Sequence, residues 1–166
     1  MSEETTTPEA AGEQKSSPAF AIKRIYLKDL SFETPMGIEA FNLQQPPKVD
    51  QELNIQVTKV DDTHSEVVLL LTITAKVEER TAFLIEVKQA GVFNITGLED
   101  AQMAQMINSA CPNILFPYAR ETIDSILTRG TFAALMLPPI NFDAMFAQAV
   151  QQQQQQAAAG NAKADA

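Results

Sequence analysis

The sequence of 166 residues contains no tryptophan, one cysteine and one histidine, and its apolar runs are short. A single cysteine excludes an internal disulfide bond, and one cysteine with one histidine cannot supply the ligands of a zinc site. The longest apolar runs fall far short of the ~20 residues that a membrane-spanning helix needs. No glycine-rich G-x-x-x-x-G-K loop is present to hold a phosphate group. We therefore expect no metal, no cofactor and no direct insertion into a membrane.

Positive charge is also scarce. The sequence has 12 Lys and Arg and 21 Asp and Glu, which gives a net charge of −9. Without a cluster of basic residues the chain is repelled by phosphate backbones and anionic lipid, which argues against nucleic acid as a partner. The charge suits a partner with a basic surface. The N-terminus has no positively charged, apolar signal segment, so we expect a soluble, cytoplasmic protein.

No residue has the setting of a catalytic group. His64 lies in the polar run 61–65, which has the composition of a surface turn. Cys111 precedes a proline and is interpreted as a structural thiol, because a nucleophilic cysteine needs a paired base and the chain has no second histidine. We predict that the protein is not an enzyme.

The two ends of the chain differ in composition from its middle. Residues 1–17 are acidic and rich in Ser and Thr, and residues 151–166 are rich in Gln and Ala. Such segments bury too little apolar surface to offset the entropy cost of ordering them. We predict a disordered acidic tail over 1–17, a single folded domain over 18–150 and a flexible tail over 151–166.

Strands dominate the first half of the predicted domain. Apolar and polar residues alternate over 53–58 and again over 67–77, and a short polar turn at 78–80 leads into a returning strand over 81–93. The first strand, 20–33, changes its apolar phase midway, which predicts a bulge or a strand that contacts different partners along its length.

The run 67–71 consists of five apolar residues in succession. A sheet that is covered by helices on one face should alternate more cleanly. We interpret the run as a strand with two buried faces, the second of them buried by another subunit.

Helices dominate the second half. Thr96 and Glu99 have the spacing of a capping box, and the helix that follows is predicted to end at Pro112. Pro117 fits the first turn of a longer helix, which Gly130 is positioned to close. Four strands followed by helices, without βαβ alternation, indicate an α+β fold.

A further helix is predicted after an extended Pro138–Pro139 linker, with Asn141 as its N-cap. Apolar residues recur on one helical stripe there, at Phe142, Met145, Phe146, Ala149 and Val150.

Three separated runs, 24–33, 111–121 and 135–146, occur in the order typical of SecB, and the chain closely resembles this family of bacterial export chaperones over roughly residues 20–150. The resemblance implies a four-stranded antiparallel sheet with helices packed on one face, assembling as a dimer of dimers (a homotetramer). It also implies an ATP-independent holdase that binds unfolded secretory precursor proteins, keeps them translocation-competent and delivers them to the SecA motor.

In that family the last helix and the crossover before it line a long apolar groove for non-native clients. The positions of this chain that match the groove are Phe41, Leu43, Met136, Leu137, Ile140, Phe142, Met145 and Phe146. Methionine beside phenylalanine gives a surface that repacks around varied partners. The chain departs from the family where relatives place a tryptophan before a loop proline, because it reads Gln44-Gln45-Pro46 there.

The resemblance also implies a docking site for the basic, zinc-binding tail of SecA. Its matching residues here are Asp29, Glu33, Leu84 and Glu86. Because side chains alternate along a strand, residues 29 and 33 share one face, and so do residues 84 and 86. Without the resemblance, acids that keep a sheet edge soluble would explain the same residues.

Two other functions remain open from the sequence. One is a SecB-like chaperone dedicated to a single client, such as a labile antitoxin, although the four docking identities disfavour it. The other is a small-molecule-binding α+β protein, which the lack of convergent polar groups near the groove disfavours.

Overall fold

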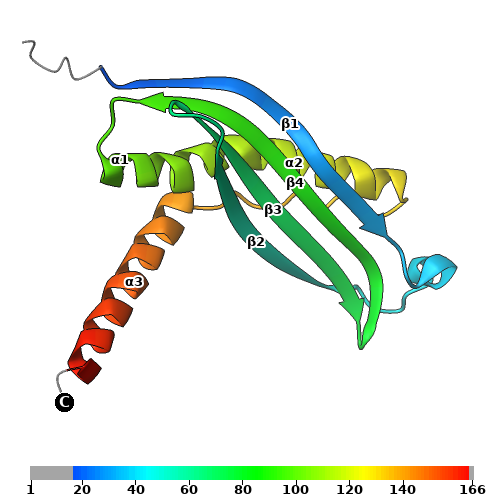
Figure 1. The fold of residues 1–166 in the computed structure, drawn as a ribbon. Helices are drawn as coiled ribbons and strands as arrows, with labels where there is room; N and C mark the ends of the chain where they lie inside the picture. The colour runs from blue at the N-terminus through cyan, green and yellow to red at the C-terminus, as the bar shows by residue number, and fades with distance from the viewer. Residues whose placement is uncertain (1–16, 165–166) are drawn as a thin grey trace, which may run out of the picture.

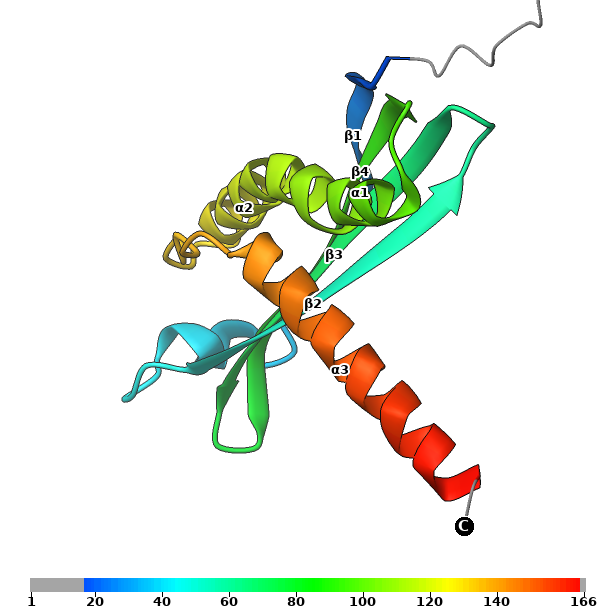
Figure 2. The ribbon, with the colours of Figure 1, turned by 90° about the vertical axis from the view of Figure 1, so that its left-hand side faces the viewer.

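The computed structural model describes residues 17–164 and has the predicted α+β architecture (Figure 1). A four-stranded antiparallel sheet has the order β1-β4-β3-β2. Helices cover one of its faces, as Figures 1 and 2 both show. The strands are β1 (Ala19–Glu33), β2 (Lys48–Lys59), β3 (His64–Val77) and β4 (Arg80–Thr96). The helices are the 3-10 turn η1 (Gly37–Phe41), α1 (Asp100–Gln105), the π-helical turn η2 (Met106–Ala110), α2 (Cys111–Arg129) and α3 (Phe142–Ala164).

The predicted change of phase in β1 is confirmed. The register against β4 shifts twice, between Ile22 and Arg24 and between Leu27 and Asp29, so β1 carries one extra residue at each shift. Each bulge returns the apolar residues to the face that bears the helices. Apolar side chains of β1 therefore stay on one face of the sheet along the whole strand.

The hydrophobic core lies between the sheet and α2. Every second residue of the two central strands is buried against the helix, as β-strand periodicity requires. The fully buried side chains of the core include Leu69, Leu71, Ile73, Ile85, Val87, Leu115, Ile123 and Leu127. On the other face of the run 67–71, Val68 is buried within the single chain and Leu70 is half-buried, and burial of this face by another subunit stays a prediction.

Gly91 lets α2 approach β4 closely. A Cβ atom at this position would lie 2.6 Å from a ring carbon of Phe93 and 3.0 Å from a methyl group of Leu115. We expect Gly91→Ala to lower the free energy of unfolding by about 1–3 kcal/mol, because an extra methyl group must displace packed core atoms. Urea denaturation at a fixed protein concentration measures the change.

Thr58→Ala serves as the control for the Gly91 variant, because Thr58 is an exposed residue of β2. This change should stay within about 0.5 kcal/mol of the unchanged protein. Equal stabilities for Gly91→Ala and Thr58→Ala would show that the strand can move away from α2 without cost.

The helical boundaries differ from the predicted ones at two places. Glu99, not Thr96, is the N-cap of α1, and its capping box partner is Gln102. Thr96 is unavailable because it is the last residue of β4, paired with Ala19. Pro112 lies in the first turn of α2, and Pro117 lies inside that helix instead of opening it.

The chain stays helical from α1 to α2 because a π-helical turn joins them. In η2 the amide of Cys111 donates to the carbonyl of Met106, a span of five residues in place of four. Turns of this kind insert one extra residue into a helix without ending it. The predicted break at Pro112 is therefore wrong, whereas Gly130 does end α2 as predicted.

α3 projects away from the sheet and from the other helices, in both views (Figures 1 and 2). Asn141 caps it as predicted, because its side-chain oxygen accepts from the amide of Ala144 at 2.9 Å. The stretch Gln151–Gln156 lies inside this helix, since Gln and Ala are good helix formers. Flexibility of this tail stays a prediction, and residues 1–16 of the predicted acidic tail lie outside the described part of the chain.

Candidate functional site

An apolar hollow of about 290 Å³ opens at one end of the sheet. Its walls come from the connection between β1 and β2, the start of β2, the start of β4 and the crossover after α2. The lining residues are Ala40, Leu43, Pro47, Val49, Ala82, Phe83, Phe132, Ala133, Ala134 and Leu135. No charged residue lines it. A hollow of this composition suits an apolar side chain better than a polar metabolite.

Phe132 is the centre of an aromatic cluster beside this hollow. Its ring centroid lies 4.9 Å from that of Phe83, 5.0 Å from that of Phe41 and 6.2 Å from that of Phe32. The separations and tilts are those of favourable aromatic pairs. Gly130 permits the approach, because a Cβ atom there would lie 2.6 Å from the Phe32 ring. Four phenylalanines thus form one aromatic cluster, in a chain that has no tryptophan.

The crossover between α2 and α3 is held in place by two side chains of α2. The carboxylate of Asp124 accepts from the amides of Leu135 at 2.9 Å and Met136 at 3.1 Å. Arg120 donates to the carbonyl of Leu137 at 3.4 Å. Met136 adopts a φ of 49°, a conformation that is unusual for a residue with a side chain, and it is 77% exposed. The crossover therefore presents a methionine side chain to the solvent.

The eight predicted groove residues do not line a single hollow. Leu43 lines the apolar hollow, and Phe41, 48% exposed, contacts its aromatic cluster. Met136 borders a second hollow of about 780 Å³ along α2, and Ile140 and Phe142 border a third of about 300 Å³.

Burial separates the remaining predicted groove residues. Leu137 and Phe142 are buried in the core, so they can support a groove from beneath but are not accessible themselves. Met145 is exposed and Phe146 is half-buried on α3. The most accessible part of the proposed groove is therefore the crossover with the cluster around Phe132.

Phe132 and Phe83 are not among the site residues predicted from the sequence. Phe83 is buried, yet its ring also lines the hollow. Phe132 lies in a segment without regular periodicity. One signal was available, because Phe132 lies two residues after the helix-ending Gly130 and before Pro138–Pro139, which places it in a crossover and not in a strand or helix.

The predicted docking residues lie together on the helix-free face of the sheet. Glu33 is paired with Leu84 across β1 and β4, and the next residues on that face are Ser31 and Glu86, also paired with each other. Asp29 follows, opposite Lys88. Because residues 83, 85, 87 and 89 of β4 are buried under the helices, the alternate residues 84, 86 and 88 point to the other face.

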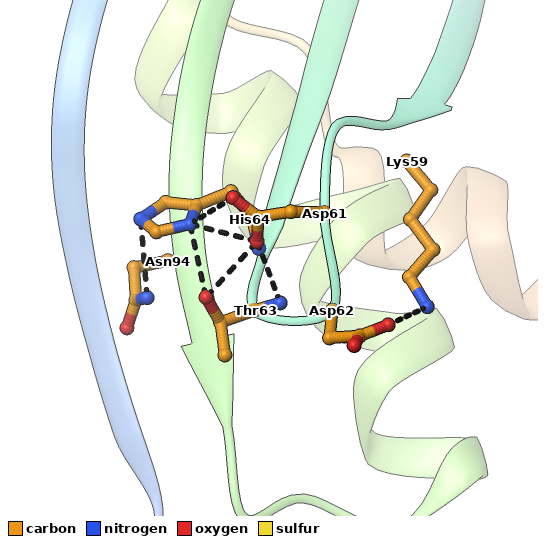
Figure 3. A network of polar contacts seen from close by, with 6 residues as sticks. All are labelled: Lys59, Asp61, Asp62, Thr63, His64 and Asn94. Atoms are coloured by element: carbon orange, nitrogen blue, oxygen red, sulfur yellow. Dashed lines mark hydrogen bonds and ion pairs between the residues drawn. The ribbon is translucent and has the colours of Figure 1, made fainter.

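His64 and Asp61 stabilise the turn between β2 and β3 (Figure 3). The Asp61 carboxylate accepts from the amides of Thr63 and His64, both at 2.8 Å, and lies 2.9 Å from His64 Nδ1. These hydrogen bonds, that from Thr63 first, hold the pKa of Asp61 well below its usual range. Asn94 of β4 contacts the other ring nitrogen of His64 at 3.3 Å. The network therefore links the turn between β2 and β3 to strand β4.

Cys111 is fully buried, and burial raises the pKa of its thiol to about 12. A thiol with such a pKa is protonated at neutral pH and is a poor nucleophile. Among residues 17–164, no group of three His, Cys, Asp or Glu side chains is arranged to hold a metal ion. None of the helices in this part of the chain is both long enough and apolar enough to cross a membrane.

The sequence matches the family model described as "Preprotein translocase subunit SecB" over residues 13–153. This chain belongs to the SecB family. Two proteins named "Protein-export protein SecB" illustrate the relationship. The first, from Cellvibrio japonicus, is 60% identical over 157 residues, covering 95% of this chain and 93% of the relative. The second, from Saccharophagus degradans, is 57% identical over 155 residues, covering 92% of each chain.

The SecB fold is also found among solved structures. A SecB-like chaperone from Mycobacterium tuberculosis, in complex with a peptide from an antitoxin, matches with a TM-score of 0.59. It is 16% identical, and the match covers 73% of this chain and 90% of that protein. At this identity the match supports the fold of the SecB domain. Membership of the SecB family gives the protein a chaperone role in protein export.

Proposed function

We propose that this protein is an ATP-independent cytoplasmic holdase that binds unfolded secretory precursors, keeps them translocation-competent and delivers them to SecA. The observation that carries the proposal is the apolar hollow and aromatic cluster around Phe132, accessible in a chain of the export family. Phenylalanine and methionine side chains can bind apolar segments of many sequences, because they adapt without requiring specific hydrogen bonds. No bond is made or broken in this function.

Client binding would begin at the crossover and continue along α3. Met136 and Met145 are exposed there, and Phe41 is accessible at the hollow. The remaining groove residues, Leu43, Leu137, Ile140, Phe142 and Phe146, would form its walls or support them. Contiguous exposed apolar surface of this kind often marks an interaction site.

Delivery would depend on the helix-free face of the sheet. Glu33 lies opposite Leu84, Glu86 is in the next row on this face and Asp29 in the row after it, and a basic tail of SecA is the partner of complementary charge for these three carboxylates. Such complementarity mainly sets the association rate and partner choice, and it weakens with salt. We also propose a homotetramer, a dimer of dimers, which would multiply the number of client and SecA sites.

Refolding of a slow-folding secretory precursor tests the holdase. With excess protein and no ATP, we expect the refolding rate of the precursor to fall several-fold, because its apolar segments are captured before they are buried. The control adds the same protein to precursor that has already folded, which should stay unaffected. An unchanged refolding rate, with the protein folded and assembled, would contradict the proposal.

The second candidate is a chaperone dedicated to one client. It is favoured by the shared fold of the M. tuberculosis SecB-like chaperone, which was solved with an antitoxin peptide. Several unrelated precursors separate the two functions, since an export chaperone should delay all slow folders and a dedicated chaperone only one. A thermal shift with metabolites but none with unfolded peptides would instead favour a small-molecule site.

A further inference from the structure

The helix-free face of the sheet carries more negative charge than the four predicted docking residues account for. Three adjacent rows run across β2, β3, β4 and β1 in register. The rows are Asn54–Leu70–Lys88–Asp29, Glu52–Thr72–Glu86–Ser31 and Asp50–Thr74–Leu84–Glu33. We call these twelve positions the sheet platform. Five of them are acidic and one, Lys88, is basic.

Lys88 lies between two of the acids that the proposed docking site requires. Its ammonium nitrogen is 3.6 Å from a carboxylate oxygen of Asp29 and 3.8 Å from one of Glu86. The Lys88 side chain is only 35% exposed, whereas Asp29 is 53% exposed. The ammonium group therefore occupies the position that a cation from a bound partner would take between these carboxylates.

We propose that Lys88 is an internal competitor of the basic partner and sets the affinity and selectivity of the sheet platform. The inference rests on the proposed docking function, because it concerns the same carboxylates. In the free protein, Lys88 pairs with Asp29 and Glu86. When a basic segment binds, its cations replace the Lys88 ammonium, which moves into solvent on its flexible four-carbon stem.

Competition of this kind discriminates between partners. A partner with a single cation replaces the ion pair of Lys88 by one of its own, so it gains little binding free energy. A segment with several cations gains additional contacts to the exposed carboxylates of Glu33 and Glu52, and a further one to Asp50 if it also displaces Lys48, which lies 3.1 Å from Asp50. Displacing Lys88 costs every partner the same free energy, so all affinities fall by the same factor and only a dense basic tail keeps enough affinity to bind.

Lys88→Gln tests the proposal, with the zinc-loaded basic tail of SecA as the probe and fluorescence anisotropy as the measurement. We expect the tail to bind about two- to fivefold more tightly, a range that corresponds to the value of an exposed ion pair. The gain should shrink as salt is added. Lys88→Arg keeps the charge and should bind like the unchanged protein.

Lys59→Gln is the matched control, because it removes the same charge at the far end of β2, where Lys59 pairs with Asp62 at 3.0 Å. It should change the affinity for the tail by less than about 1.5-fold, the long-range effect of one exposed charge. Thermal unfolding confirms that each variant is folded.

The possible outcomes separate the inference from the docking function. If Lys88→Gln binds no more tightly than Lys59→Gln, or more weakly, Lys88 is not a competitor. That result leaves the docking function intact as long as Glu86→Lys still weakens binding of the tail about tenfold or more. If Glu86→Lys has no effect on tail binding, the docking function itself fails, and the Lys88 inference fails with it.

Discussion

Glu86→Lys is expected to weaken binding of the SecA tail by about tenfold or more, while capture of unfolded precursors stays unchanged. The expected free-energy loss of about 1.4 kcal/mol or more corresponds to this factor. The change removes a carboxylate from the centre of the sheet platform and adds an ammonium group. Glu86 is 39% exposed, so its charge is partly shielded from solvent and salt.

The neighbours of Glu86 explain why reversing its charge should lower the affinity for the tail more than neutralising it. The carboxylate lies 3.8 Å from the Lys88 ammonium, so a lysine at position 86 would place two positive charges side by side. At an effective dielectric constant of ~20, charges about 4 Å apart interact by roughly 4 kcal/mol before solvent and side-chain motion reduce the value. Calorimetric titration with the tail at low and at physiological salt measures the loss.

Asp62→Lys is the control for Glu86→Lys. It makes the same change of charge in the exposed turn between β2 and β3, away from the platform. Equal losses for both variants would mean that net charge, and not docking at this face, determines the affinity. Precursor refolding in the presence of Glu86→Lys should be delayed as much as with the unchanged protein, because the apolar hollow lies on the other side of the sheet.

Strand periodicity predicted the strands and the shared faces of residues 29 and 33 and of residues 84 and 86, whereas the choice of these four residues as a docking site came from the resemblance to SecB. Two changes of phase in 20–33 indicated a bulge, and the structure has two, each restoring the inward face. The pairing of Glu33 with Leu84 and of Asp29 with Lys88 then follows from the register. The pattern could not reveal Lys88 as a neighbour of Asp29, because the separation in sequence says nothing about which strands pair.

The helices were harder to predict, because local signals gave the wrong boundary. Pro112 and Pro117 both have the properties of helix ends or beginnings, yet the helical chain passes through both. Burial of Leu115, Ile123 and Leu127 against the sheet outweighs the local cost of a proline. Tertiary packing of this kind is not encoded in any short window of the sequence.

The hollow could not be predicted at all from periodicity. Its walls come from three segments that are distant in the sequence, 40–49, 82–83 and 132–135, and Phe132 lies in a crossover with neither helical nor strand pattern. The resemblance to SecB gave the crossover and α3 as groove elements, but it assigned Leu137 and Phe142 to a surface that they support from the core. Accessibility depends on the packed structure and not on hydrophobicity alone.

Phe132→Ala is expected to have the second large effect, and it acts on client binding and stability together. The ring contacts Phe41, Phe83 and Phe32, and it lines the hollow. Truncating a fully buried phenylalanine to alanine costs about 3–5 kcal/mol of stability. For this half-buried ring we expect the free energy of unfolding to fall by roughly 2 kcal/mol. We also expect clients to bind about five- to tenfold more weakly, because an aromatic surface for their apolar side chains is lost.

Two further variants separate lost stability from lost binding. Phe20→Ala removes another aromatic pair, with Phe93 at 5.8 Å, and should destabilise the protein without weakening client binding. Phe132→Leu keeps most of the side-chain volume, so it should restore most of the stability but only part of the affinity for clients. If Phe132→Ala and Phe20→Ala weakened client binding equally, the effect would follow from global stability. A loss confined to position 132 would instead place the client at the crossover, where the backbone is fixed by Asp124 and the side chains remain accessible.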